Sequence, residues 1–372
     1  MRFLHTADWQ LGMKAVHVGD AAETVRETRL KTVEKLLKVA KDKKADFILV
    51  AGDVFEDNAV SRLLVQRVAD ILSKSKVPLY IIPGNHDPLV PGSVWEHPAW
   101  EKCKSVRLLT EDAPVEVPGG ILYPCPIKEK FSKENPTAWI PRETGEDKIR
   151  IGLAHGTVEG IQQDEVAFPI PKDAASKFGL DYLALGHWHS TAIYEDKEGV
   201  PRMAYSGTHE TTKFGERDSG NVLLVEIAEK GATPVITQVR ISELFWRTVE
   251  YEIKTPGYLP ELRGRIEDFD YSERILLNVK LSGLFYAEEV AEIKRIEEIL
   301  SSRFLYGRLD LSDLIPAPED KNWIESLPAG IIRETGERLK GICESRKGSQ
   351  PSPDIAARAL MELYMLVMGI SK

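Results

Sequence analysis

The chain has 372 residues, of which 42% are hydrophobic and 29% charged, so we expect a globular protein of two or three domains with ample core. Its formal net charge of −9 disfavours a passive polyanion binder, because contacts with phosphate groups need local Lys and Arg side chains. The charge does not exclude an enzyme that meets phosphodiesters through bound cations, which can outweigh nearby carboxylates.

The sequence carries no pattern for export or membrane insertion. No apolar run approaches the roughly 20 residues that span a bilayer, and the N-terminus MRFLHTAD lacks the layout of a signal peptide. The cysteines Cys103, Cys125 and Cys343 are far apart and form neither a metal-binding spacing nor a disulfide framework. These features predict a cytoplasmic protein without a membrane partner.

Short apolar strands alternate with helical patterns over the first part of the chain. Strands are predicted at residues 2–8, 45–53 and 77–85, and helices at residues 21–42 and 61–75. Continuous apolar strands separated by helices indicate a central sheet that is covered on both faces and is at least partly parallel.

From residue 105 onward the pattern changes to mostly strands, interrupted by a helix at residues 169–179. We predict strands at residues 105–110, 121–127, 149–156, 181–189, 201–208, 221–227 and 233–241. A second sheet packed on the first would account for this run. The predicted fold class is therefore α/β, with a two-sheet α/β sandwich over residues 1–242.

Two further regions follow the sandwich. Residues 243–315 show a β-α-β-α-β pattern, which predicts a small α/β cap domain. Residues 316–372 are expected to form a helical region, in which RKGSQPSP (346–353) is a linker and Asp354 caps a last helix. That helix is apolar over more than one stripe, so it either docks on the body of the protein or binds a partner.

Five abrupt polar insertions stand out in the first two-thirds of the chain, each directly after a predicted strand. They are Asp8-Trp9-Gln10, Gly52-Asp53-Val54-Phe55-Glu56, Gly84-Asn85-His86-Asp87, His155-Gly156 and Gly186-His187-Trp188-His189. Sites in open α/β sheets assemble at the carboxyl ends of strands, so we expect these tips to converge. Each one alone could be a turn or a satisfied core residue, but five in this order indicate a site.

The residue types in these insertions favour divalent metals. Asp8 and Asp53 are hard anionic ligands, Asn85 offers an amide oxygen, and the three histidines offer neutral imidazole nitrogens. A mixed nitrogen and oxygen set without thiolates favours Mn²⁺, Fe²⁺ or Zn²⁺. The candidates outnumber the ligands that one ion needs, so we expect two ions, roughly 3.5–4 Å apart, that share Asp53.

These motifs resemble those of the calcineurin-like metallophosphoesterases. The series D-x-[HQ], GD-x-x-[DEH], GNH-[DE], H-G and GH-x-H covers residues 5–189. Within that superfamily the chain is more similar to the SbcD family of double-strand-break repair nucleases. The opening MRFLHTADWQLG, the segment YSGTHETTKFGE (205–216) and the small cap after the core carry this closer likeness.

The resemblance implies two groups of metal ligands, and Mn²⁺ as the foremost candidate for both ions. The first ligand set would be Asp8, Gln10, Asp53 and His189. The second ligand set would be Asp53, Asn85, His155 and His187. By the same likeness, His86 would protonate the leaving oxygen or stabilise the pentavalent phosphorus, and a water made acidic by two cations would be the nucleophile.

Two positions depart from the family pattern. The family usually has histidine at the position of Gln10, whose neutral amide oxygen is a weaker donor to a transition metal than an imidazole nitrogen. We therefore expect Gln10 to face the first metal as a weak ligand or through water. Related phosphatases often have aspartate at the position of Glu56, so Glu56 or Asp57 could orient His86, or both could be solvated loop carboxylates. His209, within the segment 205–216, is expected only to support the metal ligands.

The resemblance implies a DNA exonuclease and endonuclease subunit of double-strand-break repair. Its implied partners are DNA, an SbcC-type coiled-coil ABC ATPase that contacts the C-terminal region, and a second copy of this chain. An alternative with the same fold and metals is a phosphodiesterase or phosphatase for nucleotides or other small molecules, against which the cap and the apolar tail argue. A third hypothesis is a scaffold that has lost activity, of which Gln10 in place of the usual histidine would be the sign. The presence of His86 argues against it.

Overall fold

The computed structural model describes residues 1–142, 147–160, 167–254, 257–286, 289–316, 323–325, 327–345 and 351–368. The chain divides into two compact units, Met1–Leu244 and Phe245–Lys372. Most of the predicted linker 346–353 and the side chain of Asp354 lie outside the described residues. The division of the second unit into a cap domain and a C-terminal region stays a prediction.

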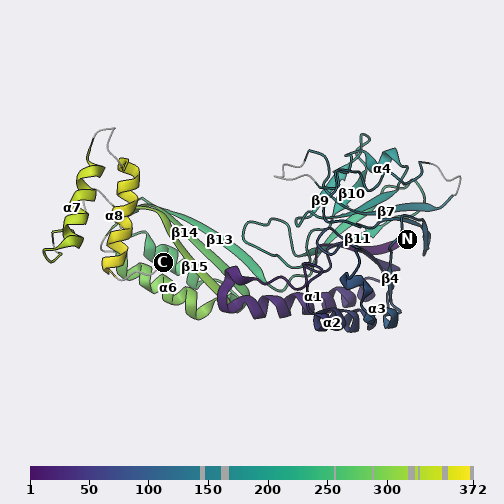
Figure 1. Ribbon diagram of the computed structural model, residues 1–372, viewed down its shortest axis with the longest axis horizontal. Coiled ribbons are helices and arrows are strands. Elements are labelled where there is room, and N and C mark those ends of the chain that lie inside the picture. The colour runs from purple at the N-terminus through teal and green to yellow at the C-terminus, as the bar shows by residue number, and fades with distance from the viewer. Residues whose placement is uncertain are drawn as a thin grey trace. The chain divides into compact units, whose positions relative to one another are not determined.

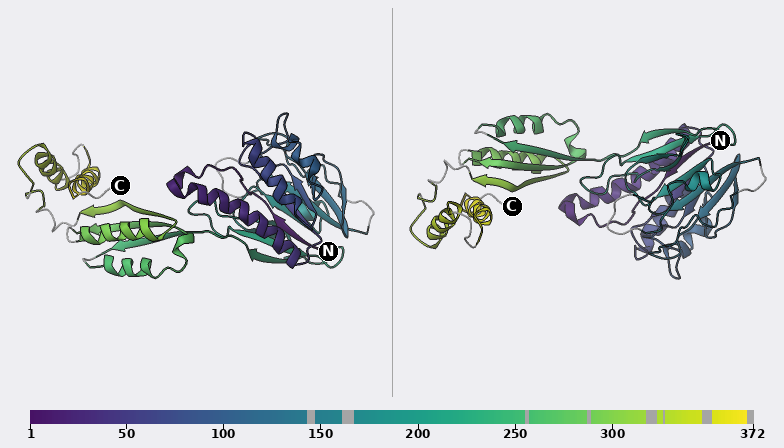
Figure 2. Two further views of the ribbon diagram at one scale, coloured as in Figure 1. Left: turned by 90° about the horizontal axis from the view of Figure 1, so that it is seen from below. Right: turned by 90° about the horizontal axis from the view of Figure 1, so that it is seen from above.

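The first unit contains a six-stranded sheet covered by two long helices. Its strands, in spatial order, are β12 (Val235–Arg240), β11 (Asn221–Glu226), β1 (Arg2–Thr6), β2 (Phe47–Ala51), β3 (Leu79–Ile82) and β4 (Val106–Leu108). Strands β1 to β4 run parallel, and β11 is antiparallel to both of its neighbours. Helices α1 (Ala22–Asp42) and α2 (Arg62–Ser73) lie side by side on one face, where Leu36 and Val68 pack against Ile48 and Val50 (Figures 1 and 2).

A second six-stranded sheet packs on the other face of the first. Its strands, in spatial order, are β5 (Val115–Val117), β6 (Gly120–Cys125), β7 (Ile149–His155), β8 (Tyr182–Gly186), β10 (Pro201–Tyr205) and β9 (Ala192–Glu195). The core between the sheets buries Phe47 and Leu49 together with Leu153 and Tyr182. The short helices of this unit are η1 (Val16–Ala21), η2 (Val94–Glu96), α3 (Ala99–Lys102) and α4 (Ala174–Lys177).

The predicted α/β fold class with two packed sheets is confirmed. Three predicted strands are present but were assigned to the wrong sheet. We expect β4, β11 and β12 in the second sheet, but all three belong to the first. Strand β11 pairs with β1, where Phe3 lies opposite Val225, and such long-range pairing leaves no trace in local periodicity. The helix predicted at residues 169–179 is only the four-residue α4, and the prediction omits the short strands β5 and β9.

The second unit has a three-stranded parallel sheet in the order β13 (Phe245–Ile253), β14 (Ile275–Phe285), β15 (Tyr306–Pro316). Helices α5 (Leu259–Glu267) and α6 (Val290–Arg303) connect these strands, and a short helix η3 (Ser272–Arg274) precedes β14. The predicted β-α-β-α-β order is therefore present. The core of this unit buries Leu262 and Ile266 of α5 and Ile293 and Ile296 of α6 against β14.

Helices α7 (Ile331–Cys343) and α8 (Pro353–Met368) complete the second unit. Tyr364 of α8 packs edge-on against Phe285 and Trp323, with ring centroids 5.3 Å and 4.9 Å away. Leu360 and Met361 are buried in the same core. Other apolar side chains of these two helices remain exposed: Ile331, Ile332, Ile355 and Leu366. One face of α8 thus docks on its own unit, and another face is open.

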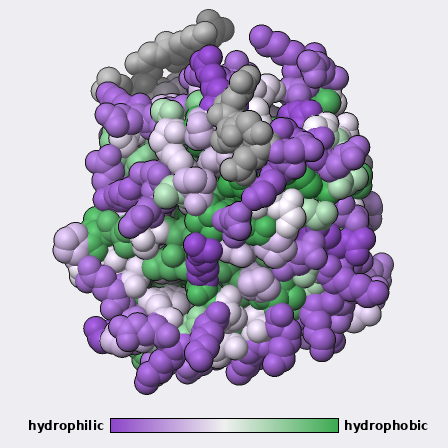
Figure 3. Space-filling model, turned by 90° about the vertical axis from the view of Figure 1, so that its right-hand side faces the viewer, coloured by the Kyte–Doolittle hydropathy of each residue, from purple (hydrophilic) through white to green (hydrophobic). Residues whose placement is uncertain are grey.

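The surface drawn in Figure 3 is mostly polar at its rim, with hydrophobic side chains visible in the middle. Apolar atoms contribute a large part of the surface of most globular proteins, so this distribution is ordinary.

Within the described part of the chain, none of the helices is both long and apolar enough to cross a membrane.

We predict that Tyr364→Ala will release α8 from the second unit. The substitution removes a fully buried aromatic side chain, which should lower the free energy of unfolding of this unit by about 3 kcal/mol. Hydrogen exchange of the α8 amides should become much faster. Leu366→Ala, on the same helix but 76% exposed, is the matched control and should leave exchange unchanged. Equal exchange in both variants would contradict this packing.

Candidate metal centre

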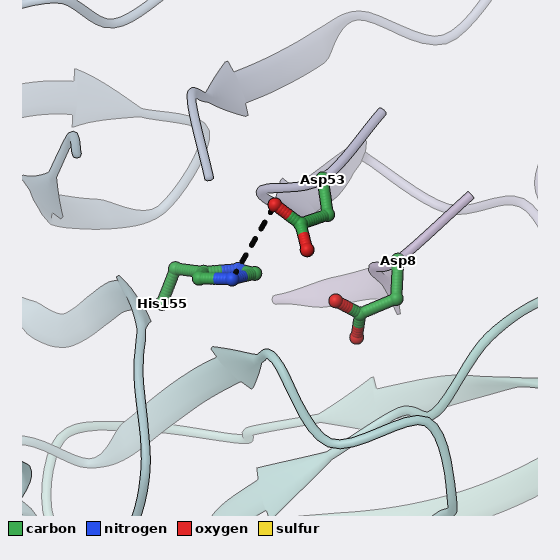
Figure 4. Close-up of side chains that lie close together, drawn as sticks. All are labelled: Asp8, Asp53 and His155. Atoms are coloured by element: carbon green, nitrogen blue, oxygen red, sulfur yellow. Dashed lines mark ion pairs between the residues drawn. The ribbon is translucent and has the colours of Figure 1, made fainter. Parts of the chain in front are cut away.

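Each predicted metal ligand lies at or just beyond the carboxyl end of a strand. The pairs of strand and residues are β1 and Asp8 with Gln10, β2 and Asp53, β3 and Asn85, β7 and His155, and β8 and His187 with His189. Because the strands within each sheet are parallel here, packing of the two sheets brings these ends together. Figure 4 shows Asp8, Asp53 and His155 pointing toward one another, and their ligand atoms lie within 4.8 Å of each other.

Two glycines allow the loops to approach this closely. A Cβ atom on Gly84 would lie 2.1 Å from Asp53 Oδ1, and one on Gly186 would lie 1.8 Å from the carbonyl oxygen of Ala51. Any larger residue at either position would therefore push the strand ends apart.

The second ligand set is brought together around Asn85. Asn85 Oδ1 lies 2.8 Å from His155 Nε2 and 2.9 Å from His187 Nδ1. Asp53 Oδ1 lies 3.5 Å from His155 Nε2. The four members of this set thus present oxygen and nitrogen atoms to one small volume.

The first ligand set is arranged through hydrogen bonds to its neighbours. Both oxygens of Asp8 accept the backbone N–H of His187, at 2.9 Å and 3.1 Å. The side-chain amide of Gln10 donates to Asp53 Oδ2 at 3.0 Å, so Gln10 does reach the bridging candidate. His189 Nδ1 lies 3.0 Å from Glu216 Oε1.

The backbone is strained at four of these positions. Asp8, Gln10 and Asp53 have φ of 54°, 47° and 53°, and His187 has φ of 106°, a range that L-residues rarely adopt. The structure holds Asp8 and Gln10 there through backbone hydrogen bonds from Asp8 N to Gly52 O and from Gln10 N to Asp53 O, at 3.1 Å and 3.0 Å. Strain of this kind concentrates at functional sites, where the surrounding fold fixes it.

Burial controls the charge of these side chains. It raises the pKa of Asp8 to about 6, although His155 and His189 act in the opposite direction. Burial would also raise the pKa of Asp53, but the nearby imidazoles of His155 and His86 outweigh it, and the pKa is lowered. Burial, with His155 as a neighbour, lowers the pKa of His187 to about 3. His187 is therefore neutral near pH 7 and has a lone pair available for a metal.

The donor atoms fit a divalent cation. His155 Nδ1 lies 2.8 Å from the carbonyl oxygen of Ala51, which can only accept, so Nδ1 carries the proton. In the neutral form of this tautomer, Nε2 presents a lone pair toward the oxygens of Asn85 and Asp53. A cation between these atoms would turn three close acceptors into ligands. Oxygen and imidazole donors without thiolates suit Mn²⁺, Fe²⁺ or Zn²⁺.

His86 lies beside this cluster and is held by main-chain groups. Its backbone N–H donates to Asp53 Oδ1 at 2.9 Å, and its Nδ1 lies 2.9 Å from the main-chain oxygen of Glu56. The hydrogen bond between Glu56 and His86 thus uses the main-chain carbonyl group of Glu56. The carboxylate is half-buried, and burial raises its pKa. A catalytic or orienting role for this carboxylate stays a prediction, while Asp57 accepts the N–H of Ala59 at 2.7 Å.

Two residues to which the sequence analysis assigns no role support the site. Asp87 accepts the N–H groups of Phe55 and Gly84 at 2.9 Å and 2.8 Å, so it joins the loops after β2 and β3. Glu216 contacts His189 directly. Asp87 lies within the GNHD insertion and Glu216 within the segment 205–216, so both were close to recognised motifs.

Comparison with known proteins shows the family of the chain. The family described as calcineurin-like phosphoesterase matches residues 1–191, more than half of the chain, and the chain belongs to that family. It is 23% identical over 282 residues to YhaO of Bacillus subtilis (strain 168), described as an uncharacterized metallophosphoesterase; the alignment covers 72% of this chain and 67% of YhaO. The crystal structure of TT1561 of Thermus thermophilus aligns with a TM-score of 0.42 and 15% identity, over 64% of this chain and 99% of that one.

Membership of this family indicates a metal-dependent phosphoester hydrolase, and Asp8, Asp53 and His155 form a candidate metal-binding cluster in the described residues. The substrate, the number of ions and the identity of the metal are matters of proposal. The individual ligand assignments likewise stay predictions.

We predict that Gln10→His will strengthen metal binding at the first ligand set by about tenfold, or ~1.4 kcal/mol. The substitution replaces a weak amide donor by an imidazole nitrogen at a position that already contacts Asp53. Calorimetric titration with Mn²⁺ measures the change, and Gln238→His on the exposed strand β12 is the matched control. Unchanged affinity and activity would show that Gln10 does not face the metal.

We also predict that metal affinity will fall as the pH decreases from 7 to 5. A ligand carboxylate must lose its proton to bind a metal, and burial raises the pKa of Asp8 to about 6. Protons therefore compete below that pH, and Asp8 alone should reduce the apparent affinity by about tenfold over this range. Titrations with Mn²⁺ at several pH values measure the slope. A flat profile would argue against Asp8 as a ligand.

Proposed function

We propose that this metallophosphoesterase is the nuclease subunit of an SbcD-type DNA repair complex, which hydrolyses phosphodiester bonds at DNA double-strand breaks. The observation that carries the proposal is the contact between the segment YSGTHETTKFGE (205–216) and the metal centre, through Glu216 and His189. This segment is one of the features that liken the chain to the nuclease branch of the superfamily, and here it forms part of the site.

The arrangement of Asp53 supports a site for two ions. Its Oδ1 faces His155 and accepts the N–H of His86, whereas its Oδ2 accepts the amide of Gln10. The two oxygens are thus divided between the second and the first ligand set, as a bridging carboxylate requires. The nitrogen and oxygen donors make Mn²⁺ our first candidate.

The proposed reaction is the attack of water on a phosphodiester. When bound, a pair of divalent cations would acidify the water and neutralise charge on the phosphoryl oxygens. His86 would act on the other oxygen of the scissile bond. Because its Nδ1–H donates to the Glu56 carbonyl, its Nε2 is the atom that can deliver a proton to the leaving oxygen.

The second unit supports a large substrate and a protein partner. A small-molecule phosphatase needs no additional α/β unit with apolar helices, and Ile331 and Leu366 of α7 and α8 are 80% and 76% exposed. Exposed apolar side chains that gather into one patch mark interaction surfaces, and we propose that those on α7 and α8 form such a patch. We propose that they bind an SbcC-type coiled-coil ABC ATPase. Leu63 of α2, 78% exposed, is our candidate for a homodimer contact, and we place the complex in the cytoplasm.

We predict Mn²⁺-dependent degradation of linear duplex and hairpin DNA by the purified protein. Hydrolysis of bis-p-nitrophenyl phosphate should accompany it, because the same chemistry applies to any phosphodiester. Turnover of the small diester together with nucleotides, but not of DNA with or without the ATPase, would favour a small-molecule phosphodiesterase.

His86→Ala is the variant that separates an enzyme from a scaffold. Loss of a general acid should lower the rate by about 10²- to 10⁴-fold, while Mn²⁺ binding remains. His97→Ala, a half-buried histidine outside the metal centre, is the control and should retain full activity. Equal, measurable rates in the parent and His86→Ala proteins would contradict the role of His86, and a parent that is inactive on every substrate would favour the scaffold.

A further inference from the structure

Glu216 is hydrogen-bonded to a candidate metal ligand from a distant part of the chain. Its side chain is only 5% exposed, and its Oε1 lies 3.0 Å from His189 Nδ1. A carboxylate can only accept hydrogen bonds, so the proton of this pair lies on His189 Nδ1. The neutral ring then has its lone pair on Nε2.

The surroundings of Glu216 require a carboxylate. The backbone N–H of Thr212 donates to Oε2 at 2.7 Å, and the hydroxyl of Thr212 donates to Oε1. Together with His189 Nδ1–H, these groups present donors to both oxygens of Glu216. A glutamine amide has one acceptor oxygen and one donor NH₂ group, so it would leave a donor facing a donor. A side chain of the same shape with only one acceptor oxygen therefore cannot replace the carboxylate.

A buried arginine fixes the segment that carries Glu216. Arg29 of α1, 1% exposed, donates to the carbonyl oxygens of Glu210 and Thr211 at 2.8 Å and 3.3 Å. The same guanidinium group donates to the carbonyl oxygen of Trp9 at 2.5 Å. Arg29 thus joins the segment before Glu216 to the loop between Asp8 and Gln10, and it holds the carboxylate at a defined distance from the first ligand set.

We propose that Glu216 is a positioning residue for the metal centre: it fixes His189 with the proton on Nδ1 and so directs Nε2 toward the first ion. This inference rests on the proposed two-ion site. Carboxylates that accept from the second nitrogen of a ligating histidine orient the ring and increase its basicity, and their loss typically lowers metal affinity by about 10- to 100-fold.

Mn²⁺ titration of the full-length protein tests the proposal. In Glu216→Gln and Glu216→Ala, one of two binding events should weaken by about 10- to 100-fold, and the other should keep its affinity. Glu198→Gln, on the exposed turn before β10, is the matched control and should bind both ions as the parent does. If the parent binds fewer than two ions, the two-ion proposal fails. If the parent binds two ions and both Glu216 variants bind them with the affinities of the parent, the role of Glu216 fails.

Nitrogen NMR of the metal-free parent protein gives a test whose decisive observation needs no stable Glu216 variant. The chain has 8 histidines, so the ring signals can be assigned by substitution. Neutral His189 should carry its proton on Nδ1 in the parent protein and should change to a mixture of tautomers in Glu216→Ala. A parent His189 with its proton on Nε2 would overturn the proposal, whatever the metal titrations give.

Discussion

The candidate site depends on one buried carboxylate that two loops hold through different oxygens. Asp53 is 1% exposed, and its two oxygens accept hydrogen bonds from the His86 backbone and the Gln10 side chain. A carboxylate removed from water is unstable unless hydrogen bonds and opposite charge compensate it. The hydrogen bonds supply part of this compensation. The imidazole of His155, 3.5 Å from Asp53 Oδ1, and bound cations would supply the remainder, since Asp8 adds a second carboxylate close by.

Much of this site could be predicted from the sequence, since polar residues that interrupt apolar strands are a local pattern. His187 and His189 lie two residues apart on an extended segment, and Asp8 and Gln10 share that spacing. A local pattern does not show which individual side chains from distant segments contact one another. Glu216 is 27 residues from His189, and the group that contacts His86 is the carbonyl of Glu56, which every residue type possesses. The pairing of β11 with β1 is likewise a contact between distant segments that no local pattern predicts.

Helix α8 shows a different limit of prediction from the sequence. Its sequence is apolar over more than one stripe, which permits both docking on the protein and binding of a partner. Folding buries Leu360 and Tyr364 against the core of the second unit and leaves Ile355 and Leu366 60% and 76% exposed. A helix can press only one face onto a sheet, so the two interpretations apply to different faces of one element and do not exclude each other.

The two predicted ligand sets are unequal, because the first contains a weaker donor, Gln10, and a histidine that a carboxylate supports, His189. The second set combines Asp53 with one amide and two imidazoles, whereas the first contains Gln10 in place of an imidazole. An amide oxygen donates weakly to a transition metal, but a carboxylate bonded to Nδ1 strengthens the imidazole of His189. Affinity for the first ion would therefore reflect a balance between Gln10 and Glu216. Arg29 binds the main chain at Trp9, next to Gln10, and at Glu210, in the segment that carries Glu216, so a displacement of either segment would alter this balance.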